Sequence, residues 1–213
     1  MKEEDLFIPG LSSYMLDLLP ERDEVLSELE KIAAENEFPI IGPLTGQFLM
    51  IIARLMNAKR ILELGSGFGY SALWFAKGLM EEGKIICTEG SEENAEKARE
   101  YFGRAGVSEK ITFHVGSALD VMDTLDGEFD IIFNDIDKED YPAAYKAAIP
   151  RLRKGGVLIT DNTLWSGRIL DTSGEVPDHV KGVLEYNRLA FTDPSVLSVI
   201  LPVRDGLTVS FKL

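Results

Sequence analysis

The stretch that most constrains the fold of this chain is ILELGSGFGYSALWFA, which runs from residue 61 to residue 76. It begins with apolar residues typical of a buried strand, continues through Gly65, Gly67 and Gly69, and ends in a helical pattern. Glycine allows a tight turn and a close approach to a ligand, because no Cβ stands in the way. The stretch therefore predicts a strand, a turn of the nucleotide-binding kind and a helix, in that order.

The spacing of these glycines argues against two common phosphate-binding motifs. The dinucleotide fingerprint G-x-G-x-x-G needs a glycine at position 70, where the chain has Tyr70. A P-loop ends in Gly-Lys-Ser or Gly-Lys-Thr, which does not follow this turn. Glu63, at the end of the strand, suits a cationic amino group better than a pyrophosphate. A nicotinamide oxidoreductase is therefore disfavoured, and an ordinary strand-to-helix turn is the remaining alternative.

Strand and helix patterns alternate along most of the chain, which favours a mostly parallel sheet with helices on both faces. The expected strands are 60–64, 84–89, 111–115, 129–134 and 156–161. The expected helices between them are 70–80, 92–105, 118–125 and 141–152. Near the end, RDG separates VLSVILPV from LTVSFKL, and this turn signal favours an antiparallel hairpin. The expected fold class is α/β, with a seven-stranded sheet that is parallel except at this hairpin.

The size and composition of the chain indicate one globular domain. Its 213 residues, 45% of them hydrophobic, can bury a sizeable core. We expect a helical cap segment over residues 1–58 and an α/β core over residues 59–213. No apolar run reaches the roughly 20 residues of a membrane helix, and the acidic start MKEEDLFIPG is unlike a signal peptide. With Cys87 as the only cysteine, these features predict a cytoplasmic protein without a membrane segment.

Oxygen-bearing side chains follow two of the expected strands. FDIIFN leads into Asp135, Asp137 and Lys138, and GGVLIT leads into Asp161 and Asn162. The carboxyl ends of parallel strands lie at one edge of a sheet, beside the glycine turn. Asp135, Asp161 and Asn162 would supply three hard oxygen ligands, which suit Mg²⁺ or another divalent cation such as Mn²⁺ or Ca²⁺. The alternative is that each run only caps a loop or a helix.

The stretch 61–76 resembles the first motif of class I S-adenosylmethionine-dependent methyltransferases. The form LELG…GYSA is particularly similar to the cation-dependent O-methyltransferases, the family that contains the catechol and caffeoyl-coenzyme A O-methyltransferases. The likeness extends from GQFLMIIARL to the C-terminal hairpin. It implies a Rossmann-like fold, S-adenosylmethionine as the cofactor, a divalent cation and a homodimer.

The resemblance also implies roles for residues around the cofactor. Ser71 would bind the carboxylate of the cofactor, and Glu89 would hold both ribose hydroxyls, since one carboxylate can accept two hydroxyl donors. The loop VGSALD would lie near the adenine, and the segment IIGPLTGQ would cover the cofactor. The expected cofactor-binding residues are Ile41, Gly42, Glu63, Gly65, Gly67, Ser71, Glu89, Gly116, Ser117, Ala118 and Asp135.

The resemblance assigns Asp135, Asp161 and Asn162 as metal ligands and Lys138 as the catalytic residue. A bound cation would orient a hydroxyl and lower its pKa, and Lys138 could take the proton if the nearby metal charge lowers the pKa of its own amine. The oxyanion then attacks the methyl carbon in line and displaces S-adenosylhomocysteine, with much of the rate supplied by positioning. Two aromatic residues, Tyr141 and Trp165, are expected to shape a pocket for a planar acceptor.

The leading interpretation is methyl transfer to a small acceptor with a catechol-like or caffeoyl-type hydroxyl. The segments TDNTLWSGRIL and LPVRDGLTVS are also similar to relatives that methylate a hydroxylated wobble uridine in tRNA. The net charge of −14 argues against tRNA, because an acidic surface repels a phosphate backbone. A non-catalytic S-adenosylmethionine-binding protein is the alternative of another class, and the joint presence of the lysine and the three predicted ligands argues against it.

Overall fold

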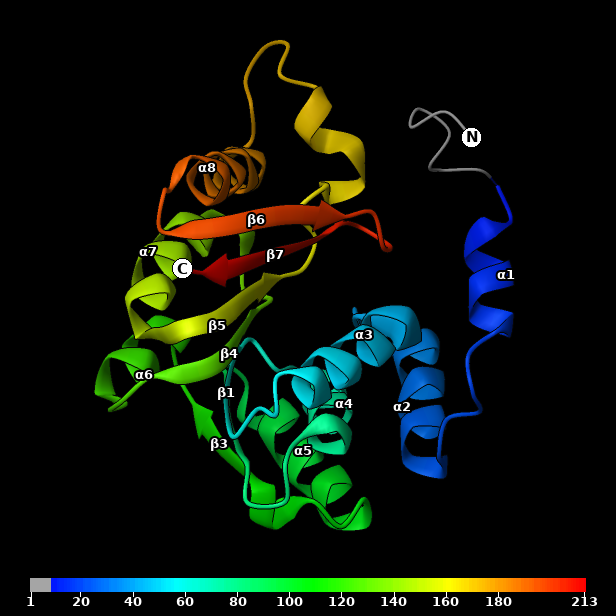
Figure 1. Cartoon of the computed structure of the whole chain (residues 1–213). Coiled ribbons are helices and arrows are strands. Elements are labelled where there is room, and N and C mark those ends of the chain that lie inside the picture. The colour runs from blue at the N-terminus through cyan, green and yellow to red at the C-terminus, as the bar shows by residue number, and fades with distance from the viewer. Residues whose placement is uncertain (1–8) are drawn as a thin grey trace.

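A computed structural model describes residues 9–213, so residues 1–8 of the expected cap segment lie outside the described residues. The centre is a seven-stranded sheet with the order β3-β2-β1-β4-β5-β7-β6 (Figure 1). The strands are β1 (Arg60–Leu64), β2 (Lys84–Glu89), β3 (Ile111–Val115), β4 (Phe129–Asn134), β5 (Leu152–Thr160), β6 (Val196–Leu201) and β7 (Leu207–Lys212). The first five strands pair in parallel, and β7 lies antiparallel between β5 and β6. The predicted fold class is confirmed.

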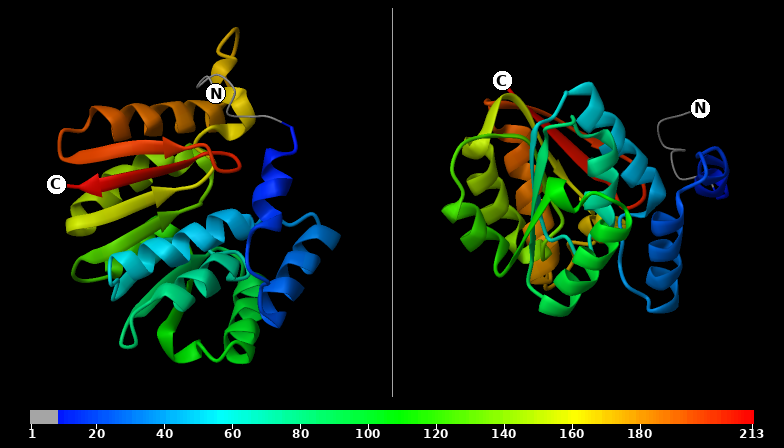
Figure 2. Two further views of the ribbon diagram at one scale, coloured as in Figure 1. Left: turned by 45° about the vertical axis from the view of Figure 1, so that its right-hand side comes forward. Right: turned by 90° about the horizontal axis from the view of Figure 1, so that it is seen from below.

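Helices cover both faces of the sheet (Figure 2) and build two apolar layers. They are α1 (Leu11–Asp17), α2 (Glu24–Glu35), α3 (Gly42–Leu55), α4 (Tyr70–Gly78), α5 (Glu92–Arg104), α6 (Ala118–Thr124), α7 (Tyr141–Arg151) and α8 (Asp178–Thr192), with short 3₁₀ turns η2 (Ser108–Lys110), η3 (Lys138–Asp140) and η4 (Trp165–Leu170). Helices α2 to α5 form one layer, and α6 to α8 form the other. None of the helices within residues 9–213 combines the length and the apolar character needed to span a bilayer.

The parallel strands are apolar on both sides because helices cover both faces. In β1, Ile61 packs into the layer of α3 and α4, whereas Leu62 and Leu64 pack into the layer of α7 and α8. This double burial explains why apolar residues such as Ile61 and Leu62 follow one another in the sequence. The predicted limits of β1 to β4 are confirmed, and each predicted helix between the parallel strands begins where expected and ends one or two residues early.

The strand β5 begins at Leu152, earlier than the predicted residue 156. Its first residues include charged side chains, which do not resemble a buried strand. The backbone nevertheless extends the sheet, because Leu152 pairs with Phe129 of β4. The guanidinium of Arg153 also donates from Nε to Asp130 Oδ1 at 2.6 Å. A neighbouring strand and an ion pair therefore determine where β5 begins.

Local signals fix the helices that border the sheet edge. Asp23 caps α2 by accepting a hydrogen bond from Leu26 N at 2.9 Å. Ser91 caps α5 by accepting from Asn94 N at 3.3 Å. Gly69 precedes α4 with φ 85, a left-handed conformation that glycine adopts without a Cβ clash. The first turn of α4 therefore stands directly behind the glycine turn.

Candidate active site

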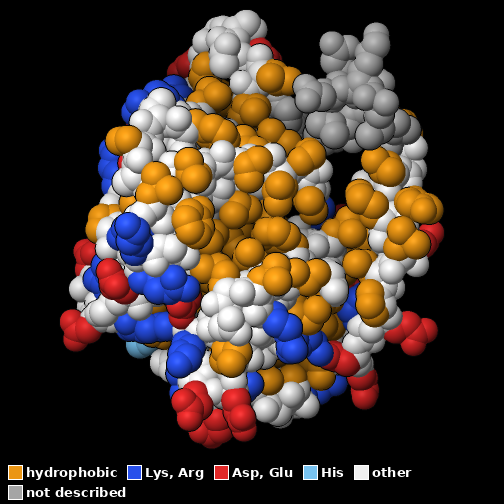
Figure 3. Space-filling view, viewed as in Figure 1, with side chains coloured by type: hydrophobic (Ala, Val, Ile, Leu, Met, Phe, Trp, Pro, Cys, Tyr) orange, Lys and Arg blue, Asp and Glu red, His pale blue; other side chains and the backbone are white. Residues whose placement is uncertain are grey.

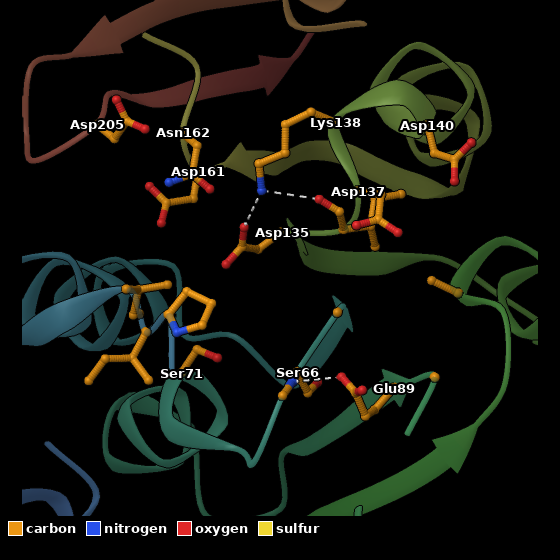
Figure 4. Close-up of a pocket in the computed structure, with 18 of the residues that line it drawn as sticks. Ser66, Ser71, Glu89, Asp135, Asp137, Lys138, Asp140, Asp161, Asn162 and Asp205 are labelled. Atoms are coloured by element: carbon orange, nitrogen blue, oxygen red, sulfur yellow. Dashed lines mark hydrogen bonds and ion pairs between the residues drawn. The ribbon is translucent and has the colours of Figure 1, made fainter. Parts of the chain in front are cut away.

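A cavity of about 1400 Å³ lies at the carboxyl ends of the parallel strands (Figure 4). This is the edge at which sheets of this type present their ligand-binding loops. Four parts of the chain form its walls: residues 38–41, the glycine turn, the loops after β2 to β5, and the turn between β6 and β7. The glycine turn and the acidic strand ends thus face one common space, as the sequence predicts.

The glycine turn lies against the end of β4. Gly65 has φ 81, and a Cβ added there would come 2.5 Å from the carbonyl oxygen of Asp135. Ser66 N donates to the carbonyl oxygen of Thr88 at 2.9 Å, which ties the turn to β2. Position 65 therefore accepts only glycine without a shift of the neighbouring backbone.

Residues 38–41, called the cover stretch below, close over this turn. The ring of Phe38 packs on the ring of Phe68 with 4.4 Å between the centroids. A Cβ on Gly67, which has φ 50, would come 3.1 Å from the Phe38 ring. Ile41 lines the cavity, whereas Gly42 lies behind the wall. The cover stretch and the glycine turn therefore enclose one end of the cavity.

The carboxylate of Glu89 is held in place where β2 ends. Gly67 N donates to Oε2 at 2.9 Å, and Ser91 N donates to Oε1 at 2.9 Å. In Figure 4 Glu89 lies beside Ser66 of the glycine turn. Asn94 Nδ2 adds a third donor to Oε1 at 3.3 Å. A carboxylate has about four lone-pair sites, so Glu89 keeps acceptor capacity toward the cavity. Beyond it, the wall continues along Gly116, Ser117 and Ala118.

Glu63 does not line the cavity, although the sequence predicts a cofactor contact there. Its side chain is fully buried, and it accepts a hydrogen bond from the Ser71 hydroxyl, which does line the cavity. The thiol of Cys87 lies 3.9 Å from Glu63 Oε2. Burial raises the pKa of Glu63 to about 8, against the opposing effect of its hydrogen bonds. Glu63 is therefore linked to the cavity through Ser71.

The acidic residues predicted as ligands converge on the other half of the cavity (Figure 4). Lys138 Nζ donates to Asp135 Oδ1 at 3.0 Å and to the carbonyl oxygen of Ile136 at 3.1 Å. Asp161 is buried, and its Oδ1 has no hydrogen-bond partner among the described residues. Asn162 follows it into the cavity wall with φ 56.

Burial makes the ionised forms of both aspartates costly. It is the largest cause of the raised pKa of Asp161, and the charge of Asp135 adds to it. Burial also raises the pKa of Asp135, although the ammonium group of Lys138 acts in the opposite direction. The ammonium group of Lys138 and the guanidinium of Arg204 lower both pKa values, but burial outweighs their effect. A bound cation would stabilise both ionised carboxylates.

The donor set is small but fits a hard cation. Among residues 9–213, no group of three or more His, Cys, Asp or Glu side chains is placed to hold a metal ion. The predicted set contains only two carboxylates, and its third member, Asn162, is an amide. The unpartnered Oδ1 of Asp161 beside Asp135 is the observation that favours a cation here. Oxygen ligands of this kind suit Mg²⁺, which usually keeps water or substrate oxygens as further ligands.

Two aromatic rings flank the ammonium group of Lys138. Nζ lies 5.2 Å from the ring centroid of Tyr141 and 5.4 Å from that of Trp165, within the range of cation–π attraction. Trp165 lines the cavity. Tyr141 does not, because it is fully buried and its hydroxyl donates to the carbonyl oxygen of Asp161 at 2.9 Å. The predicted role of Tyr141 as a pocket wall is corrected to support from behind the wall.

Most of the predicted site residues line the cavity. They are Ile41, Gly65, Gly67, Ser71, Glu89, Gly116, Ser117, Ala118, Asp135, Lys138, Asp161, Asn162 and Trp165. The cavity is also lined by Phe38, Arg204 and Asp205, which no motif in the sequence singles out. Arg204 and Asp205 belong to the RDG sequence, which predicts a hairpin turn but gives no indication that the turn lines a cavity.

Together, the strand order, the antiparallel terminal hairpin and the glycine turn define the Rossmann-like fold of a class I S-adenosylmethionine-dependent methyltransferase. A profile of the O-methyltransferase family matches residues 17–213, and the chain belongs to that family. It is an S-adenosylmethionine-dependent O-methyltransferase, which confirms the class that the sequence predicts.

The similar proteins include plant enzymes and solved bacterial structures. The chain is 35% identical to a caffeoyl-CoA O-methyltransferase of Medicago sativa, over 96% of this chain and 89% of that protein. An O-methyltransferase from Bacillus cereus, solved in complex with SAH, superimposes with a TM-score of 0.87 at 29% identity, over 96% of this chain and 97% of that one. TomG from Streptomyces achromogenes, an O-methyltransferase involved in tomaymycin synthesis and solved with SAM, gives a TM-score of 0.86 at 30% identity, over 100% of this chain and 99% of that one.

Proposed function

We propose that this enzyme uses a divalent cation to methylate a hydroxyl of a small aromatic acceptor of the catechol or caffeoyl type. The observation that carries the proposal is the convergence of Lys138, Asp135 and Asp161 in one half of the cavity, where Asp161 Oδ1 has no hydrogen-bond partner from residues 9–213. The glycine turn and Glu89 occupy the other half. Donor and acceptor molecules would therefore meet between the two halves.

The cofactor is assigned to the half that contains the glycine turn. The carboxylate of Glu89, already oriented by Gly67 N, would accept the two ribose hydroxyls. The adenine would lie along residues 116–118, and the Ser71 hydroxyl would bind the carboxylate of the amino-acid end. This assignment is supported by the relatives solved with SAH and with SAM.

The cation is assigned to Asp135, Asp161 and Asn162. When bound, it would polarise the hydroxyl of the acceptor and lower the pKa of that hydroxyl. Burial excludes competing water from Asp161. The backbone after β5 is held by Tyr141, whose hydroxyl binds the carbonyl oxygen of Asp161 at 2.9 Å. These contacts fix the ligand-bearing segment before any acceptor arrives.

Lys138 is assigned as the proton acceptor. Its Nζ lies 3.0 Å from Asp135 Oδ1, which places it beside the proposed ligand set. In its neutral form it would take the proton of the acceptor hydroxyl. The oxygen lone pair would then form the bond to the methyl carbon as the carbon–sulfur bond breaks, and the product would be S-adenosylhomocysteine with an uncharged sulfur. The flat ring of Trp165, 5.4 Å from Nζ, offers a wall for a planar acceptor.

The deciding experiment is a methyl-transfer assay on a panel of catechols, caffeoyl thioesters and tRNA that carries a hydroxylated uridine. We expect transfer to small acceptors only, and loss of activity when a chelator removes divalent cations. Asp161→Ala should reduce activity by at least about 100-fold while it still binds S-adenosylhomocysteine. Asp126→Ala, at an exposed position outside the cavity, is the matched control. Full activity in chelator, or transfer to tRNA alone, would contradict the proposal.

We also propose that the enzyme is a homodimer that associates through the uncovered face of the hairpin. Helix α8 packs against one face of β6, but Leu197, Val199 and the neighbouring Phe211 of β7 are exposed on the other. Ile51 and Leu55 of α3 continue this surface, which is largely apolar in Figure 3. The strand β6 is also an edge of the sheet, and an apolar edge strand favours association.

The proposed dimer is tested by the molar mass in light scattering. Val199→Glu should reduce the mass from two chains to one, because a charge at the centre of an apolar contact is costly. Phe191→Glu is the control, since Phe191 is similarly exposed but lies on α8. A dimeric Val199→Glu variant would place the contact elsewhere.

We also propose the cytoplasm as the compartment of this enzyme, because Cys87 is a buried free thiol and a reducing compartment keeps thiols free.

A further inference from the structure

The turn between β6 and β7 touches both halves of the cavity. It contains Arg204, Asp205 and Gly206, which the sequence predicts only as a hairpin turn. In Figure 1 this turn projects toward the start of α3, and in Figure 4 Asp205 lies near Asn162 and Asp161. A turn that only reverses the chain does not require contacts with two separate walls of the cavity.

Arg204 reaches the cover stretch. Its Nη1 donates to the carbonyl oxygen of Ile40 at 2.5 Å, across 164 positions of sequence. The guanidinium also occupies the space beside Gly42, where an added Cβ would come 3.2 Å from Arg204 Cζ. Gly42 has φ 69, so the absence of a side chain serves both its conformation and this contact. Arg204 thus fastens the end of the cover stretch to the sheet.

Asp205 and Gly206 reach the loop that follows β5, residues 162–167. The Asp205 carboxylate accepts a hydrogen bond from Ser166 N. The carbonyl oxygen of Asp205 accepts from Leu164 N at 2.8 Å, and that of Gly206 accepts from Thr163 N at 3.0 Å. A Cβ on Gly206 would come 2.7 Å from Leu164 N, so glycine is required for this close approach.

The contact of Arg204 with the cover stretch and the contacts of Asp205 with loop 162–167 both involve residues in unfavourable backbone conformations. Asn162, Trp165 and Ser166 have φ 56, 48 and 51, and Arg204 has φ 50. A residue with a side chain loses about 1 kcal/mol or more in this left-handed region. Such conformations persist where surrounding contacts over-determine them. The hydrogen bonds of the turn are the contacts that hold the loop and Arg204 in place.

We infer that Arg204 and Asp205 are positioning residues, one for each half of the cavity. Arg204 holds the cover stretch over the amino-acid end of the cofactor, and Asp205 holds loop 162–167 around the acceptor. One turn therefore sets the distance between the donor wall and the acceptor wall. The identity of the two halves rests on the proposed function.

The test measures the binding of S-adenosylhomocysteine to variants of Arg204 and of Asp205 by calorimetric titration, without added metal. Arg204→Gly removes the contact with Ile40 and also relieves the left-handed φ. We expect its affinity to fall about 5- to 20-fold, as for the loss of a charge-assisted hydrogen bond, without a loss of thermal stability. Arg204→Lys keeps the charge that faces Asp135 and Asp161 and should restore most of the affinity. Asp205→Ala should bind within about 2-fold of the unchanged protein, because its contacts lie on the other wall.

Hydrogen exchange measured by mass spectrometry gives a second readout that needs no activity. Arg204→Gly should speed amide exchange in residues 38–42, and Asp205→Ala should speed it in residues 163–167. Asp205→Asn retains an oxygen that can accept from Ser166 N and should leave exchange near its original rate. In the methyl-transfer assay, Asp205→Ala should raise KM for the acceptor but leave KM for the cofactor unchanged.

The inference is overturned if Arg204→Gly binds S-adenosylhomocysteine as tightly as the unchanged protein. It is also overturned if both variants loosen the same segment, or if Asp205→Asn is as defective as Asp205→Ala. Failure of the proposed function gives a different result. If the proposed function is wrong, the unchanged protein would bind S-adenosylhomocysteine but methylate no small aromatic acceptor. The exchange rates of residues 38–42 and 163–167 would still test the roles of Arg204 and Asp205.

Discussion

The hydroxyl of Ser71, which lines the cavity, donates a hydrogen bond to the carboxyl group of Glu63, which is fully buried behind it. This link joins the start of α4 to the end of β1. Burial raises the pKa of Glu63 to about 8 from its ordinary value of 4.5. The site therefore contains a carboxyl group that stays protonated near neutral pH unless a cationic ligand favours its ionised form.

The first prediction concerns the pH dependence of stability. Between pH 4.5 and about 8 the unfolded chain releases the Glu63 proton and the folded chain keeps it. The free energy of unfolding therefore falls as the pH rises through this window and levels off above pH 8. The contribution is at most about 5 kcal/mol, at 1.36 kcal/mol for each unit of pKa. In urea unfolding, Glu63→Gln should gain stability relative to the unchanged protein from pH 5 to pH 8. Parallel profiles for the two proteins would show that Glu63 titrates normally.

The second prediction separates the two effects of Asp161 on stability. Without metal, Asp161→Asn should unfold at a higher temperature than the unchanged protein at pH 8, because it removes a buried carboxylate that lies beside the carboxylate of Asp135. Mg²⁺ at a hundred times its Kd should stabilise the unchanged protein by about 2.7 kcal/mol. It should not stabilise the variant, whereas Asp126→Asn should respond like the unchanged protein. Equal stabilisation of all three by Mg²⁺ would place the cation outside the cavity.

The third prediction concerns the proton acceptor. Lys138→Met keeps an unbranched side chain of nearly the same length but removes the amine, and we expect kcat to fall about 10²- to 10⁴-fold. The affinity for S-adenosylhomocysteine should change little, since Lys138 contacts Asp135 and Ile136 on the acceptor side. Lys138→Arg retains a cation between Tyr141 and Trp165 but does not act as a base. If Lys138→Arg keeps nearly full kcat, the positive charge at this position is sufficient for catalysis and Lys138 is not the proton acceptor.

The sequence predicted the strand ends because both faces of the parallel strands are buried. Residues 60–64 and 129–134 are rich in large apolar side chains, and each segment leads directly into a glycine or an aspartate of the site. Residue type, strand end and sheet direction together were enough to bring Asp135 and Asp161 into one cavity. Short-range patterns succeed here because the topology of a parallel sheet gathers the strand ends at one edge.

The parts that sequence analysis missed depend on contacts that no local pattern encodes. Arg204 contacts Ile40 across 164 positions, and no periodicity indicates that pairing. Tyr141 begins α7, but its sequence position does not say whether its ring faces the cavity or the layer beneath it. The structure places the ring of Tyr141 against that of Tyr186 at a centroid distance of 5.6 Å. Helix α1 also went unpredicted, since none of its residues is buried and its pattern is correspondingly weak.

The last prediction concerns Asn134, which ends β4 directly before Asp135. It is fully buried, and neither its Nδ2 nor its Oδ1 has a hydrogen-bond partner among the described residues. An unpartnered buried amide costs about 1 to 3 kcal/mol, and valine favours a strand. Asn134→Val should therefore raise the free energy of unfolding by about 1 kcal/mol in urea titrations.

Thr163→Val is the matched control for this substitution. Thr163 is equally buried, but its Oγ1 accepts a hydrogen bond from the Thr208 hydroxyl at 2.8 Å. Removal of one partner leaves the Thr208 hydroxyl unsatisfied, so this variant should lose about 1 kcal/mol. Both substitutions replace a buried polar side chain with valine. If they change the free energy of unfolding in opposite directions, the difference follows from hydrogen bonding. If Asn134→Val also loses stability, the amide has a partner such as a buried water molecule, and Asn134 supports Asp135 from beneath.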